Sequence, residues 1–409
     1  MTKTPKLRFP GFTDDWEQRK LGEVADFTKG KGYSKNDLIE KGSPIVLYGR
    51  LYTNYETVIT DVDTFVNEQP NSVISKGNEV IVPASGESPE DIARASAIRK
   101  TGIILGGDLN IVYPKKQLRS EFLALTISNG KPQKELVKRA QGKSVVHIRN
   151  SDLEKVVFSN PTLPEQEAIG TFFCQLDELL TLHQRKLDDV KNLKQSLLQK
   201  MFPKNGEVVP EVRFPDFTNA WEQRKLGEVA DVRDGTHNSP KYQGDGYPLI
   251  TSKNVSNGFV NYNDIQYISS EDFDEINKRS KVEVNDILMG MIGTIGNLAL
   301  IRTEPNFAIK NVALIKYINR VSYLYLYHNL QTQYVEKQIL SGMDGGTQKF
   351  LSLKKIRELN ILVPWESEQE AIGTFFRQLD ELLTLHQRKL ISGEKREKCN
   401  IFMIIIKTG

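Results

Sequence analysis

The chain has 409 residues, of which 26% are charged and 39% hydrophobic, the profile of a globular protein with room for two or three domains. Its formal net charge is only +3, so any nucleic-acid surface must come from a local concentration of charge. Five histidines and two cysteines argue against a metal framework. The absence of a secretory segment, and of the roughly 18 apolar residues of a membrane span, predicts a cytoplasmic protein.

A long internal repeat organises the chain. WEQRKLGEVAD occupies residues 16–26 and returns unchanged at 221–231. LDELLTLHQRKL likewise occupies 176–187 and 379–390, each time preceded by EQEAIGTFF. Identity over such lengths predicts two related halves, in which near-identical connectors flank inserts that share little sequence.

In chain order, the repeats predict four parts. Residues 1–160 are a connector and a first variable domain, and 161–202 are a long helix. Residues 203–363 are a linker and a second variable domain, and 364–409 begin with a second helix. Short β-branched runs bounded by Gly, Pro and Asn predict mixed, strand-rich variable domains, each ending in a helix (EFLALTISNG and SYLYLYHNLQTQYVEKQIL). The glycine-rich GMIGTIG at 290–296 fits no phosphate-binding motif and predicts a turn among strands.

The two long helices carry apolar residues at a 3/4 spacing, which predicts a seam for a partner helix, each copy being the obvious partner of the other. Thr162 and Glu165 can form a capping box at the start of the first helix. His183 and His386 fall at matching seam positions, where packing is favoured over catalysis. The predicted seam residues are Ile169, Phe172, Leu176, Leu179, Leu187, Val190, Leu193, Leu197, Ile372, Phe375, Leu379 and Leu382.

The sequence contains none of the nucleotide-binding, metalloprotease, serine-hydrolase, nuclease or amino-methyltransferase motifs, which favours recognition over catalysis. The variable domains carry a small excess of Lys and Arg over Asp and Glu, whereas the first long helix does not. Loop residues with suitable side chains are candidate DNA contacts, although a solvated surface would look the same. These candidates are Lys29, Lys31, Tyr33, Lys35, Arg50, Lys143, Ser144, Arg233, His237, Asn238, Lys241, Lys253, Asn254, Gln348 and Lys349.

Each copy of the repeat has a WEQRKLGEVAD-type start, a variable domain and a Gly-Ser/Thr loop (GKS at 142–144, GGTQ at 345–348). A Pro-x-x-x-Glu-Gln junction and a long helix follow. This ordered, duplicated layout resembles the specificity subunit of a type I restriction–modification system. No single motif is decisive, but the ordered set covers residues 1 to about 390.

The resemblance implies an α+β protein in which two mixed α/β target-recognition domains are separated by two long antiparallel spacer helices, with an internal pseudo-twofold repeat. It implies a non-catalytic subunit whose domains each read one half of a bipartite site in double-stranded DNA. Modification subunits, two of them, would dock on the connectors and methylate adenine, and restriction subunits would cleave unmodified DNA. S-adenosylmethionine, ATP and Mg would be bound by those partners, with no cofactor or metal in this subunit.

The sequence departs from this pattern after Leu390, where ISGEKREKCNIFMIIIKTG replaces a continued seam. Gly393 would weaken a helix by about 1 kcal/mol relative to Ala. Our hypothesis is an altered or truncated reading frame that leaves the end of the spacer unpaired and exposes the aggregation-prone IFMIII at 401–406. Two other functions stay open: a duplicated helical scaffold holding two protein partners without reading DNA, and a stand-alone enzyme.

Overall fold

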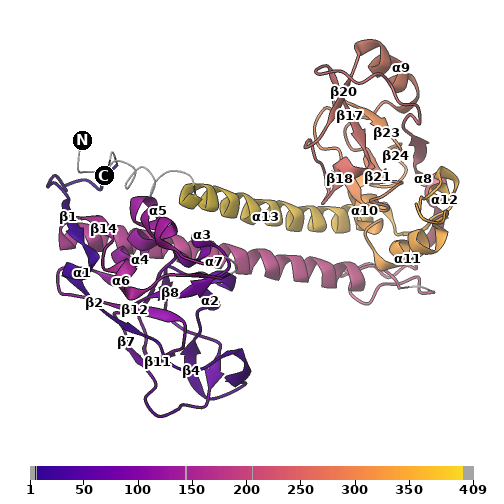
Figure 1. Cartoon of the computed structure of the whole chain (residues 1–409). Coiled ribbons are helices and arrows are strands. Elements are labelled where there is room, and N and C mark those ends of the chain that lie inside the picture. The colour runs from indigo at the N-terminus through magenta and orange to yellow at the C-terminus, as the bar shows by residue number, and fades with distance from the viewer. Residues whose placement is uncertain (1–4, 6, 143–144, 205, 399–409) are drawn as a thin grey trace. The chain divides into compact units, whose positions relative to one another are not determined.

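The computed structural model describes residues 5, 7–142, 145–204 and 206–398, with side chains to residue 392. By its internal contacts the chain forms a first unit, residues 1–185 with 386–409, and a second unit, residues 186–385. Each unit combines mixed sheets with helices (Figure 1). The long helix α7 (Leu163–Lys200) begins in the first unit and ends in the second, and α13 (Glu366–Lys398) does the reverse.

In the first unit, two five-stranded sheets follow the orders β2-β12-β8-β10-β5 and β3-β6-β4-β11-β7, and β1-β14 and β13-β9 form two-stranded sheets. Residues of β8 are buried throughout, as expected for a central strand covered on both faces. The strands are β1 (Glu17–Lys20), β2 (Ala25–Lys29), β3 (Leu38–Ile39), β4 (Ser43–Val46), β5 (Val58–Ile59), β6 (Phe65–Val66), β7 (Ile74–Lys76), β8 (Val80–Pro83), β9 (Ser85–Gly86), β10 (Ser96–Ile98), β11 (Thr101–Leu105), β12 (Leu109–Pro114), β13 (Val146–His147) and β14 (Val157–Asn160). The helices before α7 are α1 (Leu21–Val24), α2 (Arg50–Thr53), α3 (Pro89–Ile92), α4 (Ser120–Ser128), α5 (Gly130–Arg139) and α6 (Asn150–Leu153).

In the second unit, a four-stranded sheet has the order β16-β24-β21-β22, a three-stranded sheet β20-β17-β23, and β15-β25 and β18-β19 are pairs. The strands are β15 (Glu222–Lys225), β16 (Asp231–Asp234), β17 (Tyr247–Thr251), β18 (Val255–Ser256), β19 (Phe259–Val260), β20 (Gln266–Ile268), β21 (Ile287–Gly290), β22 (Leu298–Leu300), β23 (Ala308–Lys310), β24 (Val312–Lys316) and β25 (Asn360–Val363). The helices before α13 are α8 (Leu226–Val229), α9 (Ser270–Ser280), α10 (Tyr323–Asn329), α11 (Gln333–Gly342) and α12 (Leu353–Arg357).

Two local predictions concern the glycine-rich stretch at 290–296 and the end of the second variable domain. The glycine-rich stretch at 290–296 is the turn between β21 and β22, which pair antiparallel, as predicted. The single helix predicted at the end of the second variable domain is instead two helices, α10 and α11. Thr332 separates them because its hydroxyl accepts a hydrogen bond from the N–H of Val335 and caps α11.

The predicted fold class is confirmed in its mixed α/β domains, its long helices and its internal repeat. The second helix, however, does not end at Leu390, since α13 continues through Gly393 to Lys398. The predicted exposure of IFMIII at 401–406 concerns residues outside the described part of the chain. Glu165 differs from the predicted capping box as well: Arg8 and Trp16 bind its carboxylate, so a tertiary contact uses the side chain.

Burial along the helices corrects the predicted seam. A row of buried and half-buried positions follows strict 4,3 spacing, and at three points it lies one residue after the prediction: Phe173, Leu180 and Lys194 are less exposed than Phe172, Leu179 and Leu193. In α13, Phe376 and Leu383 likewise replace Phe375 and Leu382. The pattern was misread because an apolar residue directly precedes each of these positions, and at Lys194 the seam position itself is polar. The seam residues are Ile169, Phe173, Leu176, Leu180, His183, Leu187, Val190, Lys194, Leu197 and Met201 in α7, and Ile372, Phe376, Leu379, Leu383, His386 and Leu390 in α13.

Candidate nucleic-acid interface

In the second unit, the loop that carries His237, Asn238 and Lys241 is fixed to the turn between β23 and β24. Gly235 and Thr236 donate backbone hydrogen bonds of 3.0 Å to the carbonyls of Val312 and Ile309, respectively. A Cβ on Gly235 would lie 2.3 Å from the carbonyl oxygen of Ile309, so only glycine permits this approach. The loop therefore leaves β16 along one defined path.

Side chains extend this attachment. Nδ1 of His237 lies 2.8 Å from Oδ1 of Asn311, and Nε2 lies 2.8 Å from Oδ2 of Asp234. The ammonium group of Lys310 donates to the Ser239 hydroxyl at 2.7 Å and to the Tyr242 hydroxyl at 3.2 Å. The side chains of Asn238 and Lys241, held between these attachments, are exposed.

Ser252 connects the loop attachment to two other predicted segments. Its hydroxyl donates to the carbonyl of Asn311 at 2.6 Å and accepts from the N–H of Met291 at 3.1 Å. Leu351 in turn donates its N–H to the carbonyl of Met291 at 2.9 Å. The loops around residues 237, 253 and 348 are thus linked, and Lys253, Gln348 and Lys349 are exposed on them.

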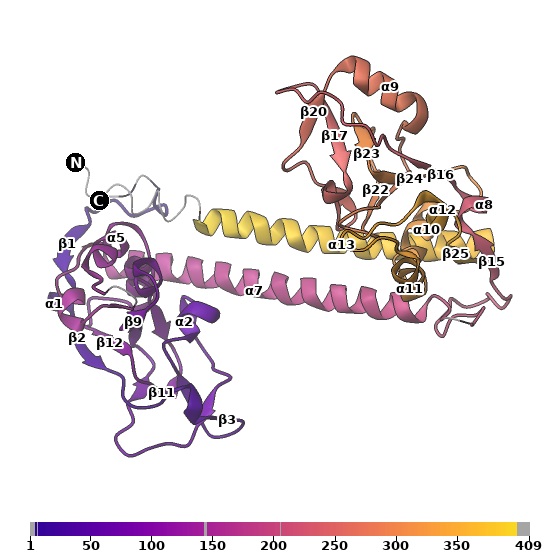
Figure 2. The ribbon, with the colours of Figure 1, turned by 45° about the vertical axis from the view of Figure 1, so that its right-hand side comes forward.

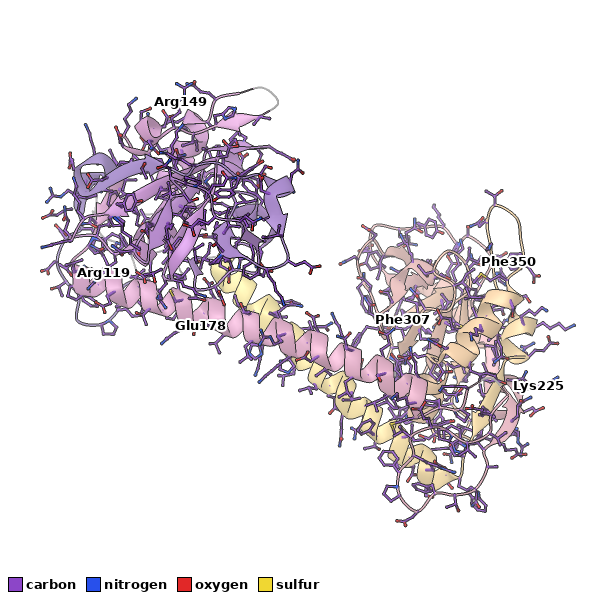
Figure 3. All side chains as sticks on the ribbon, turned by 90° about the horizontal axis from the view of Figure 1, so that it is seen from below. Arg119, Arg149, Glu178, Lys225, Phe307 and Phe350 are labelled. Carbon is purple, nitrogen blue, oxygen red and sulfur yellow. The ribbon has the colours of Figure 1, made fainter. Side chains whose placement is uncertain are left out.

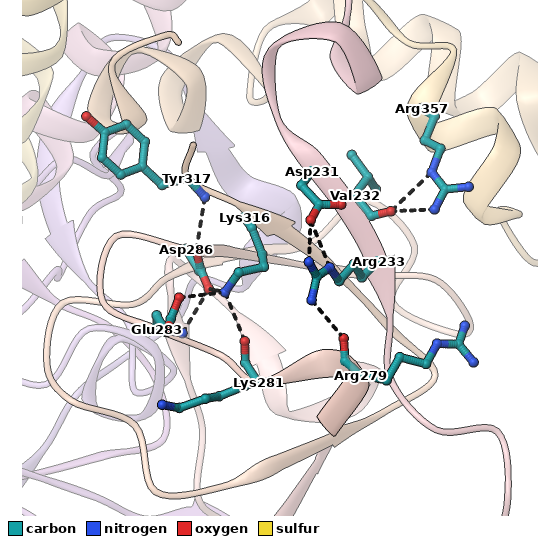
Figure 4. Close-up of polar contacts among 10 residues, drawn as sticks. All are labelled: Asp231, Val232, Arg233, Arg279, Lys281, Glu283, Asp286, Lys316, Tyr317 and Arg357. Carbon is teal, nitrogen blue, oxygen red and sulfur yellow. Dashed lines mark hydrogen bonds and ion pairs between the residues drawn. The ribbon is translucent and has the colours of Figure 1, made fainter. Parts of the chain in front are cut away.

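Two predicted contacts in this unit have structural roles instead. Asn254 is 2% exposed; its amide donates to the carbonyls of Asn261 and Asn263 and its oxygen accepts from Thr251. Arg233 pairs with Asp231 and donates to the carbonyl of Arg279, as Figure 4 shows. Asn254 is therefore buried and holds its loop together, and Arg233 has its guanidinium partly engaged within the fold.

In the first unit, the segment after the connector is positioned in a comparable way. Gly30 donates its N–H to the carbonyl of Leu109, and Gly107 donates to the carbonyl of Gly32. Tyr33 has a positive φ of 59°, and its hydroxyl lies 2.6 Å from that of Ser72, so it shapes the loop. The three lysines predicted in this segment are exposed: Lys29, Lys31 and Lys35.

Arg50 does not fit its predicted role. Its guanidinium pairs with Glu56 at 2.7 Å and with Asp63 at 2.9 Å, and its side chain is only 13% exposed. The charge of Arg50 is thus paired with two exposed carboxylates of its own domain, so its guanidinium is engaged within the fold. Lys143 and Ser144 lie outside the described residues.

The repeated connectors contain hydrogen bonds that the sequence did not predict. Two hydrogen bonds of 2.7 Å join Arg8 to Glu165, and two of 2.7 Å join Arg213 to Glu368. Gln166 accepts from the N–H of Arg119, beside the first turn of α7 (Figure 3), and Gln369 accepts from Ser322 in the same way. In the sequence, the only indication of these contacts was that RFP, Trp and EQ recur at fixed offsets in both copies of the repeat.

The connectors also present apolar surface. A cavity of about 200 Å³ in the first unit is lined by Leu7, Phe9, Trp16, Ile169 and Phe172, among others. Away from the seam, α7 exposes Leu179 and Leu182 in the first unit, and α13 exposes Leu382 and Leu385 in the second. The two leucine pairs are the same repeat positions, so an identical exposed apolar ridge occurs in each unit.

The helix seam contains two polar layers. In the first unit, Nδ1 of His183 lies 3.1 Å from Nδ1 of His386, its own repeat equivalent. In the second unit, Lys194 pairs with Asp380 at 2.6 Å, and Phe202 lies 5.8 Å from Phe376, so the two helices run antiparallel there (Figure 2).

His328 on α10 lies beside that ion pair, with Nε2 3.9 Å from Asp380. Burial and the positive charge of Lys194 lower the pKa of His328 well below its ordinary value.

The described residues include no cluster of three or more potential metal ligands. Within the same part of the chain, no helix combines the length and apolar character needed to cross a membrane.

Comparisons with known proteins agree with this architecture. The family model described as "Type I restriction modification DNA specificity domain" matches residues 13–192 and again 218–392. The MjaVIII type I restriction enzyme specificity subunit of Methanocaldococcus jannaschii is 20% identical over 96% of this chain and 92% of its own length. The putative MjaX specificity subunit of the same organism is 21% identical, over 94% and 91%. A crystal structure of the type I restriction–modification S subunit from M. genitalium superposes with a TM-score of 0.67 at 17% identity, covering 98% of this chain and 99% of that one.

Proposed function

Because the chain belongs to the type I restriction–modification DNA specificity family and carries its domain twice, we propose that it directs its complex to a bipartite DNA sequence. Each unit would read one half-site through its variable domain. One observation carries the proposal: the connectors repeat almost letter for letter, down to their buried ion pairs, whereas the variable domains differ in sequence and in sheet arrangement.

Exposed lysine and amide side chains on linked loops support DNA reading by these domains. In the second unit the candidates are Asn238, Lys241, Lys253, Gln348 and Lys349, all exposed on loops joined through Ser252 and Asn311. In the first unit they are Lys29, Lys31 and Lys35. Such side chains can contact phosphates and base edges, and phosphate contacts position the protein while base contacts give specificity.

The repeated surface supports docking of two copies of one partner, the modification subunit. Leu179 with Leu182, and Leu382 with Leu385, are exposed although the chain's own seam does not need them. Exposed leucines spaced three residues apart on a helix form a ridge suited to a partner helix. The cavity beside Phe9 and Phe172 offers a second apolar anchor point.

The remaining chemistry is assigned to partners. Under this proposal S-adenosylmethionine binds the modification subunits, which methylate adenine, and ATP and Mg act in the restriction subunits, which cleave unmodified DNA. The chain itself would supply sequence specificity and assembly, and the long helices would set the separation of the half-sites. At about 1.5 Å per residue, the 38 residues of α7 measure about 57 Å.

Adenine-methylation profiling tests the proposal. The chain and its modification subunit are expressed in a host lacking adenine methylation, and all modified sites are sequenced. We expect one bipartite motif, of which one half changes when residues 27–160 are exchanged for those of a relative. Absence of methylation, together with stable assembly of two partner subunits, would favour the scaffold function instead.

A further inference from the structure

The His237 ring is held between two oxygen atoms on different segments. Nε2 faces the carboxylate of Asp234, and Nδ1 faces the amide oxygen of Asn311, each at 2.8 Å. A neutral imidazole carries one N–H and can donate to only one of them, whereas the imidazolium donates to both. Hydrogen bonding to Asn311 and then to Asp234 raises the pKa of His237.

The charged groups around the ring come from three elements. Asp234, at the end of β16, is 10% exposed and also pairs with Arg279 of α9. Lys310, at the end of β23, directs its ammonium group to Ser239 and Tyr242 of the same loop. Arg279 opposes protonation of the ring, but the carboxylate between the two cations favours it. With His237 protonated, the cluster of Asp234, Arg279 and His237 carries a net positive charge, and both cations are more than half exposed.

Protonation has two consequences for this surface. It lets the ring donate to Asn311 and Asp234 at the same time, which adds to the backbone hydrogen bonds that fix the loop carrying Asn238 and Lys241 to the β23–β24 turn. It also adds a positive charge where a polyanion would approach, and phosphates near an imidazolium stabilise its charged form. Both effects raise the affinity of this surface for DNA.

We propose that DNA binding by the second unit is coupled to proton uptake at His237, which acts as a positioning residue for the 236–242 loop. This inference rests on the proposed function. By linkage, affinity is greatest where His237 is protonated before binding and weakens as pH rises through its titration range. A pKa difference of one unit between free and bound chain corresponds to a tenfold change in affinity.

The test measures duplex binding by the full chain assembled with its modification subunits, at constant ionic strength, from pH 6 to pH 9. The probe is a labelled duplex carrying the motif found by methylation profiling. We expect wild-type affinity to weaken about three- to tenfold over this range. His237→Gln should remove that dependence and match the wild type at high pH. Asn311→Asp should move the midpoint to higher pH, since a carboxylate then faces Nδ1.

His147→Gln is the matched control, because His147 is an exposed histidine of strand β13 in the first unit, and it should keep the wild-type slope. A thermal melt checks that His237→Gln remains folded. The ring signal of His237, followed by NMR in the chain without DNA, should titrate above about 6.5, the ordinary value. Titration at or below that value, or an unchanged slope in His237→Gln, overturns the inference. Binding that is sequence-selective but independent of pH overturns this inference and leaves the proposed function intact. The absence of binding at any pH rejects the proposed function as well.

Discussion

Arg8 and Glu165 form a bidentate ion pair across 157 residues of chain, with two hydrogen bonds of 2.7 Å. Arg213 and Glu368 repeat it, again with two hydrogen bonds of 2.7 Å. In each pair the carboxylate is almost completely buried and the guanidinium is at most 13% exposed. Each pair attaches the segment before a connector strand to the first turn of a long helix, which ties the start of a repeat to its end.

Glu165→Gln and Glu368→Gln should each destabilise the chain by about 3 kcal/mol, because each leaves a buried guanidinium without its counter-charge. Chemical denaturation followed by tryptophan fluorescence checks this, since Trp16 and Trp221 lie in the two connectors. Glu17→Gln is the control: it breaks the exposed Glu17–Arg19 pair and should cost less than about 1 kcal/mol. Equal losses for the buried and exposed pairs would contradict this account.

His328 should make the second unit sensitive to acid. Burial lowers its pKa in the folded chain, so between that depressed value and about 6.5 the unfolded chain binds a proton that the folded chain does not. Stability is therefore fully present above about 6.5 and falls as pH decreases, by up to about 1.4 kcal/mol per pH unit from this group. His328→Leu should abolish that component in melting curves recorded from pH 5 to 8.

Leucine suits this substitution because Leu125 occupies the equivalent position of the first repeat, 203 residues earlier. His147→Gln, at an exposed position, should leave the acid sensitivity intact. A variant at position 328 that remains as acid-sensitive as the wild type would place the responsible group elsewhere.

The exposed leucines should matter for assembly and not for folding. Leu179→Ala with Leu182→Ala should change the free energy of unfolding by less than about 1 kcal/mol, since both side chains already face solvent. Binding of the modification subunit to that unit should fall at least tenfold, measured by calorimetry. Leu187→Ala, in the buried seam, should have the opposite effect: it should lower the free energy of unfolding by about 2–5 kcal/mol and affect partner binding less.

The neighbouring residues Lys253 and Asn254 should differ in role, the first contributing to DNA binding and the second to folding. Asn254→Ala should destabilise the second unit by about 1–3 kcal/mol, because it leaves the carbonyls of Asn261 and Asn263 without their donor. Lys253→Ala should leave melting unchanged and weaken DNA binding, with a shallower dependence on salt. DNA affinity that is unaffected by Lys253→Ala would remove this residue from the candidate interface.

The sequence by itself determined the repeat, the two long helices, the mixed variable domains and the family, because these features depend on contiguous sequence identity and on the regular spacing of apolar residues. It misplaced part of the seam: Lys194 occupies a seam position and pairs with Asp380, and apolar periodicity alone cannot identify a polar residue that is paired across an interface.

Only the tertiary structure distinguished exposed loop side chains from those that hold loops together. Asn254 and Lys253 are adjacent in the chain, yet one is buried by its hydrogen bonds to Asn261 and Asn263 and the other faces solvent. Arg50 pairs with Glu56 and Asp63, and the ring of His237 lies between two oxygen atoms, one of them from a turn more than seventy residues away. Asn311 reaches His237 only because distant segments of the chain pack together. The partners of Arg50 and Asn254 lie within 13 residues, but they meet only in the folded conformation of their loops, which apolar periodicity and turn residues do not specify.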